Sequence, residues 1–231
     1  MRILAIECSS DIASLALLEG DSVLWERSWE GGAPQSRQAW VADIDAWVRN
    51  GTIPLRKVDV FAVGVGPGAF SGLRMAISFM HGLVLPVRAL LYGVSSGAAL
   101  AWRAARDLKA TRIVVAGDAR RNEIWLGRFG CASNYPESEV PWSVVPFDRL
   151  PPDYVTSDAT WVTADWHRMG ARLKALCPPG SRVVEARRVP EARDVGLLAA
   201  AGLAAGRASL PLTPLYLHPA VFIPPRDAAV R

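Results

Sequence analysis

The chain has 231 residues, and 51% of them are hydrophobic, which is enough for one large core or two smaller ones. No stretch reaches the roughly 18 apolar residues that span a bilayer, and the first residues lack the pattern of a signal peptide. The three cysteines lie far apart without a CxxC motif, which argues against a disulfide framework and suits a reducing compartment. We therefore expect a cytoplasmic protein with no membrane partner.

The net charge of +4 is unevenly distributed along the chain. Residues 170–231 carry 9 of the 26 basic side chains but only 4 of the 22 acidic ones. A basic end of this size suits either an anionic partner such as RNA or an ordinary solvated, arginine-rich surface. Because no run of like charge is dense, we favour the solvated surface, and direct contact with tRNA stays open.

The N-terminal half alternates apolar runs with amphipathic stretches. The Gly20-Asp21 pair predicts a hairpin turn. Apolar runs bounded by turn residues predict strands over residues 2–7, 13–20, 22–29, 58–65 and 88–94. Helical periodicity predicts helices over residues 34–51, 70–84 and about 96–107.

After Lys109 the pattern restarts more loosely. It predicts strands over residues 112–118, 122–129, 142–147 and 182–185, a loop with a short strand over 151–165, and helices over 166–176 and 192–207. Both halves therefore run strands first, then helix, strand, helix. This order predicts two α/β units of similar topology, residues 1–109 and residues 110–231.

The stretch GVGPGAFSGLR, residues 64–74, joins a buried strand to a helix through a glycine-rich turn. Gly66, Gly68 and Gly72 could let the backbone approach a phosphate, with Ser71 at the helix N-terminus. The same glycines could equally serve only to make a tight turn. Neither the Walker spacing nor GxGxxG is present, so both interpretations stay open on these residues alone.

The helix that follows is apolar around much of its circumference. Its two apolar faces are Leu73, Ile77, Met80 and Val84, and Met75, Ala76, Phe79 and Leu83. One core needs an apolar stripe of about 100°, and this helix has roughly twice that. The second face must be covered by another domain or by a partner. The helix over 34–51, with Trp40 and Trp47, is the natural neighbour to share such an interface.

Four segments now make a family resemblance visible. They are MRILAIECSSDIASLAL, VGVGPGAFSGLRMAISFMHGL, YGVSSGAALA and AGDARRNEIWLGRF, which span most of residues 1–129. In order and spacing they resemble the TsaB family, subunits of the bacterial machinery that makes threonylcarbamoyladenosine on tRNA. The remaining residues match weakly, through the closing PLTPLYLHP. The resemblance implies an actin-like/Hsp70/sugar-kinase (ASKHA) fold of two βββαβα-type domains, in agreement with the order of elements.

The resemblance also implies a role without catalysis or a cofactor. TsaB proteins bind and support TsaD, their catalytic paralogue, in forming N6-threonylcarbamoyladenosine at position 37 of ANN-reading tRNAs. TsaE joins the complex, contact with tRNA would be indirect, and a homodimer could form when TsaD is absent. TsaB pairs with TsaD through its first two long helices. The interface candidates are therefore Trp40, Ile44, Trp47, Arg74, Ile77, Phe79 and Met80.

The alternative is an ATP-dependent phosphotransferase of the same superfamily, which needs acids positioned for Mg²⁺. Glu7, Asp11 and Asp118 are the only acids well placed by sequence, and Glu7 replaces the aspartate usual in the family. The candidates for a vestigial phosphate loop are Ser9, Ser10, Gly66, Gly68, Ser71 and Gly72.

No catalytic residue and no metal site is expected. The three histidines share no helical spacing, and residues 92–107 lack the HxxxH pair of TsaD relatives. Without HExxH or GxSxG, a metallopeptidase and a serine hydrolase are both disfavoured.

Overall fold

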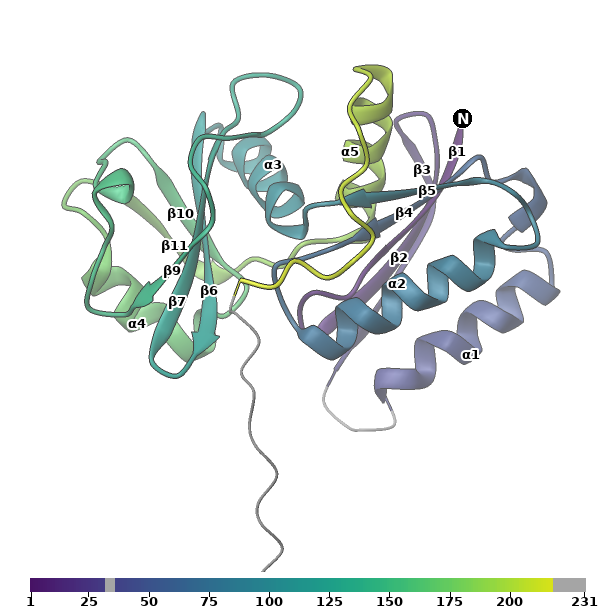
Figure 1. Cartoon of the computed structure of the whole chain (residues 1–231), viewed down its shortest axis with the longest axis horizontal. Coiled ribbons are helices and arrows are strands. Elements are labelled where there is room, and N and C mark those ends of the chain that lie inside the picture. The colour runs from purple at the N-terminus through teal and green to yellow at the C-terminus, as the bar shows by residue number, and fades with distance from the viewer. Residues whose placement is uncertain (32–35, 218–231) are drawn as a thin grey trace, which may run out of the picture.

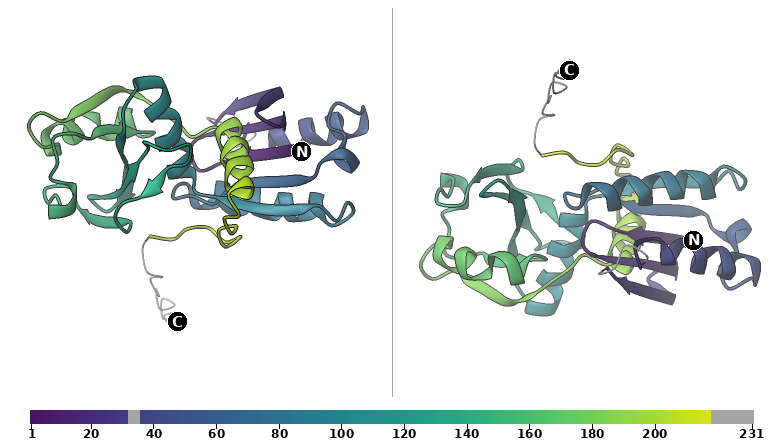
Figure 2. Two further views of the ribbon diagram at one scale, coloured as in Figure 1. Left: turned by 90° about the horizontal axis from the view of Figure 1, so that it is seen from above. Right: turned by 90° about the horizontal axis from the view of Figure 1, so that it is seen from below.

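The computed structural model describes residues 1–31 and 36–217, with the side chains of 36–39 left aside. The chain forms two lobes, each built around one mixed sheet (Figure 1). Figure 2 shows from above and below that the lobes lie side by side. Within the described ranges, no helix has the length and apolar character to cross a membrane.

The first lobe contains a five-stranded sheet of order β3-β2-β1-β4-β5. Its strands are β1 (Arg2–Glu7), β2 (Ile12–Glu19), β3 (Ser22–Glu30), β4 (Val60–Gly64) and β5 (Leu90–Val94). β1, β2 and β3 pair antiparallel, and β2 and β3 are joined at Gly20, which has φ +58. β4 pairs parallel with β1 and β5 and is buried along its whole length, as its continuous apolar run predicts.

Helices cover both faces of this sheet. α1 (Ser36–Arg49) and α2 (Phe70–Val84) lie on one face, and α5 (Ala192–Ala204) lies on the other. Alternation along β1 decides which core each side chain joins: Leu4 and Ile6 pack with α1 and α2, whereas Ile3 and Ala5 pack with α5. The 3-10 turn Leu55–Lys57 connects α1 to β4.

The second lobe repeats the strand order of the first. Its sheet has the order β11-β10-β6-β7-β8, with β9 also paired to β7. The elements are β6 (Arg112–Arg120), β7 (Glu123–Gly130), β8 (Glu137–Ser138), β9 (Ser143–Pro146), β10 (Thr160–Thr163), α4 (Trp166–Leu176) and β11 (Arg182–Arg187). In both sheets an antiparallel hairpin flanks a central strand that has two parallel strands on its other side. The predicted two-domain actin-like fold is therefore confirmed.

Two helices lie between the lobes. α3 (Ser96–Leu108) contacts β6 and β7, although it follows the strands of the first sheet, and α5 contacts β1, β2 and β4, although it follows the second. The strands divide as predicted, but each of these helices packs on the sheet of the other half. The division into domains 1–109 and 110–231 therefore stays a proposal, which describes the strands of the two sheets but not the packing of α3 and α5.

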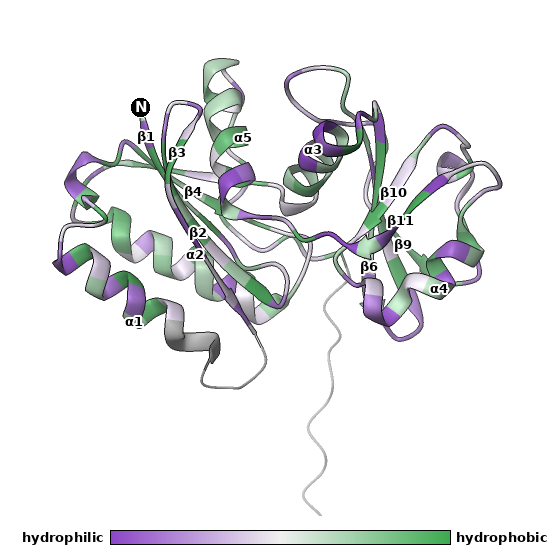
Figure 3. Ribbon diagram, turned by 180° about the vertical axis from the view of Figure 1, so that it is seen from behind, coloured by the Kyte–Doolittle hydropathy of each residue, from purple (hydrophilic) through white to green (hydrophobic). Residues whose placement is uncertain are grey.

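The other differences from the predicted elements are small. The two-residue strand β8 was not predicted, and a 3-10 turn (Pro152–Tyr154) stands where the first lobe has α1. α5 ends at Ala204, and Gly206 follows with φ +67. The predicted start of the first helix, at residue 34, lies outside the described residues. Figure 3 shows hydrophobic residues along the central strands of both lobes and mixed faces on α1 and α4.

Part of the basic end of the sequence forms long-range ion pairs. Four of its arginines pair with acids that precede residue 170: Arg187 with Asp11, Arg188 with Asp107, Arg193 with Glu26 and Arg207 with Glu137. These four arginines therefore connect distant segments of the chain.

The segment after α5 returns to the first lobe. We call residues 209–217 the C-terminal strap. The Leu210 amide donates to the Gly93 carbonyl (3.1 Å), and the Leu215 amide donates to the Val65 carbonyl (2.8 Å). The strap therefore lies along β5 and crosses the end of β4, where β4 meets the glycine turn (yellow in Figure 1).

Candidate functional site

A cleft of about 730 Å³ separates the two lobes. Its walls are the turn between β1 and β2, the glycine turn at residues 66–69, the start of α3, the turns after β6 and β10, and the end of the C-terminal strap. Ligand sites occur preferentially at interfaces between domains, so the phosphotransferase alternative can be judged from the residues of this cleft.

The glycine turn packs directly on the turn between β1 and β2. A Cβ on Gly68 would lie 2.2 Å from the Ser9 carbonyl oxygen, and one on Gly72 would lie 2.1 Å from that of Cys8. The Gly66 amide donates to Ser96 Oγ (3.0 Å), and the Ala69 amide donates to the Ser9 carbonyl (2.7 Å). Close packing alone accounts for these glycines, and the two amides are already occupied within the chain.

The serines of the predicted phosphate loop also line the cleft. The Ser9 amide donates to Glu7 Oε1. Ser10 Oγ donates to the Ile12 carbonyl and accepts from the Ile12 amide, each at 3.1 Å, which makes a local turn. Ser71 is exposed on the first turn of α2. The predicted candidates are thus brought together, but most of their polar groups bond to the chain itself.

Glu7 lies at the end of β1 and is fully buried beneath the glycine turn. Burial raises the pKa of its carboxyl above the usual range, although hydrogen bonds from Ser9 and Ser96 oppose the shift. A Cβ on Gly64 would collide with Glu7 Oε2, so β4 is shaped around this side chain. Glu7 is therefore enclosed by the first lobe and does not face a ligand.

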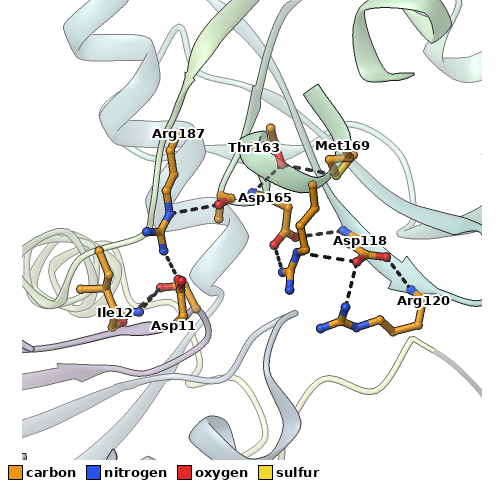
Figure 4. Close-up of polar contacts among 11 residues, drawn as sticks. Asp11, Ile12, Asp118, Arg120, Thr163, Asp165, Met169 and Arg187 are labelled. Carbon is orange, nitrogen blue, oxygen red and sulfur yellow. Dashed lines mark hydrogen bonds and ion pairs between the residues drawn. The ribbon is translucent and has the colours of Figure 1, made fainter. Parts of the chain in front are cut away.

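The aspartates that line the cleft are paired with arginines (Figure 4). Asp11 pairs with Arg187, which also donates from Nε to the Ala164 carbonyl (3.2 Å). Asp118 pairs with Arg120 (3.1 Å) and lies 3.7 Å from Arg168.

Asp165 completes this network. It pairs with Arg168 and accepts the Asp118 amide at 2.9 Å. A nucleotide-bound Mg²⁺ needs free carboxylate oxygens. Here arginine side chains and backbone amides occupy both oxygens of Asp118 and Asp165 and one oxygen of Asp11. The acids of the cleft therefore leave few free ligands for a Mg²⁺-nucleotide.

Sequence reasoning missed Asp165, Arg168 and Arg187, because nothing in the local pattern pairs them with Asp11 or Asp118. It also missed the backbone at the tip of the β6–β7 hairpin, where Arg120, Arg121 and Asn122 have φ of 66, 50 and 64. Asn122 favours this left-handed conformation, but arginine carries no such signal.

The two histidines that the structure describes lie apart. His81 on α2 and His167 on α4 are both exposed, in different lobes, and His218 lies outside the described residues. Across residues 1–31 and 36–217, no group of three or more His, Cys, Asp or Glu side chains could hold a metal ion.

The predicted interface residues on α1 and α2 divide into two sets. Trp40, Ile44, Ile77 and Met80 are between 0% and 6% exposed, because they form the core between these helices and the sheet. They are therefore not available to a partner in this conformation, which corrects their predicted role. Arg74 is exposed, and Trp47 and Phe79 are half-buried.

The structure also decides between the two apolar faces of α2. Leu73, Ile77 and Met80 of the first face are buried, whereas Val84 at the end of that face is half-buried. Ala76, which the sequence pattern assigns to the second face, is buried with them. Phe79 lies on the second face and packs edge-on against Trp40 of α1, with ring centroids 4.9 Å apart. α1 therefore covers part of the second face.

A partly buried apolar strip remains on the same side of α2. Met75, Phe79 and Leu83 are half-buried, and Arg74, Ser78 and His81 beside them are exposed. Trp47 of α1 is packed against Trp25 and Trp29 of β3, with ring centroids 4.5 and 5.7 Å away. Trp47 therefore packs toward β3. We call the six α2 residues the α1–α2 surface, because Phe79 among them contacts Trp40 of α1.

Comparisons with known proteins agree with the resemblance. A family model described as TsaD, tRNA N6-adenosine threonylcarbamoyltransferase, matches residues 36–136. The tRNA threonylcarbamoyladenosine biosynthesis protein TsaB of Escherichia coli (strain K12) is 30% identical over 129 residues, 56% of this chain and 55% of that protein. The TsaB of Buchnera aphidicola subsp. Schizaphis graminum is 29% identical over 127 residues, 55% of this chain and 60% of that protein. The chain thus spans little more than half the length of these curated relatives.

The structural comparison extends over nearly the whole chain. YeaZ from Pseudomonas aeruginosa has a TM-score of 0.77 and 28% sequence identity, and the match covers 94% of this chain and 99% of that one. The second lobe, where the sequence resemblance is weak, is therefore included in the shared fold. These matches make the chain similar to TsaB proteins in sequence over little more than half of its length, and to YeaZ in fold over nearly all of it.

Proposed function

We propose that this chain is a non-catalytic subunit that binds TsaD and supports it in forming N6-threonylcarbamoyladenosine on tRNA. The observation that carries the proposal is the state of the cleft. Asp11, Asp118 and Asp165 are each paired with an arginine, and the glycine turn is filled by the neighbouring β1–β2 turn. A protein that keeps an actin-like fold while occupying its ligand groups internally is suited to a structural role.

We propose the α1–α2 surface as the site that TsaD contacts. Partly buried apolar side chains beside an exposed arginine have the composition typical of interface centres. Met75, Phe79 and Leu83 would supply the apolar contact, and Arg74 would supply a charge. The buried residues Trp40, Ile44, Ile77 and Met80 would act indirectly, by holding the two helices in place.

The finer points of the proposal follow from the family. They are modification at position 37 of ANN-reading tRNAs, entry of TsaE through the complex, indirect contact with tRNA, a homodimer in the absence of TsaD, and a cytoplasmic location. The three cysteines are free, which suits that compartment.

Reconstitution with TsaD and the other modification proteins of the same organism tests the proposal. Modified adenosine should form with this chain present and fall to background without it. The variant Asp11→Asn/Asp118→Asn, checked for an unchanged melting temperature, should retain full activity, because neither carboxylate performs chemistry. Loss of activity in that variant with TsaD capture intact would favour the phosphotransferase alternative, as would a micromolar Mg·ATP site in calorimetric titration.

A further inference from the structure

One corner of the cleft mouth is built from two distant segments. Phe70 and Arg74 lie on the first turns of α2, and Tyr216 belongs to the C-terminal strap. The Arg74 guanidinium carbon lies 3.8 Å from the centre of the Phe70 ring. Arg74 Nε donates to the Tyr216 hydroxyl at 2.9 Å, and the Phe70 and Tyr216 rings are 5.2 Å apart. Each aromatic side chain is about half exposed, at 50% and 48%.

The strap itself is anchored before it reaches Arg74. The Leu215 amide donates to Val65 at the end of β4, one residue before Tyr216. The tyrosine therefore approaches Arg74 from a fixed point of the sheet. Stacking on Phe70 and the hydrogen bond to Tyr216 together restrict a side chain that would otherwise sample many rotamers.

Among the described residues, no acid pairs with the terminal nitrogens of Arg74. In the part of the chain that the structure describes, Arg74 forms no ion pair, whereas Arg120, Arg168 and Arg187 around the same cleft each do. Nε is occupied by Tyr216, so the planar pair Nη1 and Nη2 remains to bind an incoming group. This fork matches the geometry of a carboxylate, which it can bind through two parallel hydrogen bonds.

We infer that Arg74 binds an acidic side chain of the partner protein and that Tyr216 is its positioning residue. The inference rests on the proposed function, because Arg74 belongs to the α1–α2 surface. It adds the strap to the interface and identifies the chemistry of the contact. Phe70 and Tyr216 hold the guanidinium in its binding orientation before the partner arrives, so less freedom is lost on binding.

Affinity measurements with the TsaD protein of the same organism test this. Arg74→Ala should weaken binding at least about 30-fold, because the partner's carboxylate would be left unpaired. Tyr216→Phe removes a single hydrogen bond and should weaken binding about three- to tenfold. In an Arg74→Ala background, Tyr216→Phe should have no further effect, since the tyrosine acts through the arginine. A purely structural role for Tyr216 would give the same loss in both backgrounds and would overturn the inference.

The chain contains a matched control. Arg172 is stacked on Phe147 at 3.8 Å and donates to Asn122 Oδ1 at 2.6 Å, but it lies on α4 of the other lobe. Arg172→Ala should leave the affinity for TsaD unchanged. If wild-type chain fails to bind TsaD, the proposed function fails. If wild type binds TsaD and Arg74→Ala binds it equally well, only this inference fails. The same conclusion holds if Arg74→Ala keeps its affinity for TsaD but binds tRNA more weakly.

Discussion

The substitution Ile77→Glu tests whether the side of α2 that carries Ile77 faces the sheet. Ile77 is 6% exposed and packs against the sheet with Leu73 and Met80. Ile77→Glu loses the burial of an aliphatic side chain, about 1.5–3 kcal/mol. The new carboxyl must also be neutral to stay buried, and protonating a group of pKa about 4.3 at pH 7 costs about 3.7 kcal/mol. Together these costs reach about 5–7 kcal/mol, which is comparable to the whole stability of many domains.

Urea unfolding of Ile77→Glu, Ile77→Met and Phe79→Glu measures these differences. Ile77→Met keeps the volume and should cost less than about 1.5 kcal/mol. Phe79 is half-buried, so a glutamate there can reach water and mainly loses the edge-on contact with Trp40, about 0.5–1.5 kcal/mol. Phe79→Glu should therefore stay folded and lose TsaD capture.

The pH dependence adds a second measurement. Because the cost of protonating the buried glutamate falls with pH, the deficit of Ile77→Glu should shrink by about 2.7 kcal/mol between pH 7 and pH 5. An Ile77→Glu variant with wild-type stability at pH 7 would refute the core assignment of this face. A Phe79→Glu variant that stays folded and still captures TsaD would place the interface elsewhere.

Two further substitutions test the glycine turn and a buried acid. Gly68→Ala should lower the free energy of unfolding by about 1–3 kcal/mol, because its Cβ would lie 2.2 Å from the Ser9 carbonyl oxygen. The Cβ of Gly82→Ala meets nothing within 4 Å, so this variant should be about 0.5–1 kcal/mol more stable than wild type. Equal shifts in melting temperature for the two variants would contradict the packing argument. Burial raises the pKa of Asp194 to about 7, so the stability tied to its proton is complete below about pH 4 and is lost as the pH rises through 7. Asp194→Asn should therefore be more stable than wild type at pH 8 and not at pH 5. Urea unfolding of both proteins at the two pH values measures this. A difference in the free energy of unfolding that is the same at both pH values would argue against this titration.

Local patterns in the sequence predicted most of the elements. The continuous apolar run at β4 and the 3.6-residue period of α2 are properties of neighbouring residues, so they can be identified before folding is considered. The Gly20-Asp21 turn likewise predicted the β2–β3 hairpin. The family resemblance rested on the same local stretches, which is why it was clear over residues 1–129 and weak beyond them.

The site depended on contacts between residues far apart in the chain. Asp11 and Arg187 are 176 residues apart, and Arg74 and Tyr216 are 142 apart, so no local period relates them. The doubled apolar arc of α2 correctly indicated extra burial, but only the packing of α1 revealed that Trp40 supplies part of it from within the chain. A periodic pattern records how much apolar surface a helix must bury. Which neighbour covers that surface is decided by the tertiary arrangement, because burial against the chain's own helices and burial against a partner remove the same area from water.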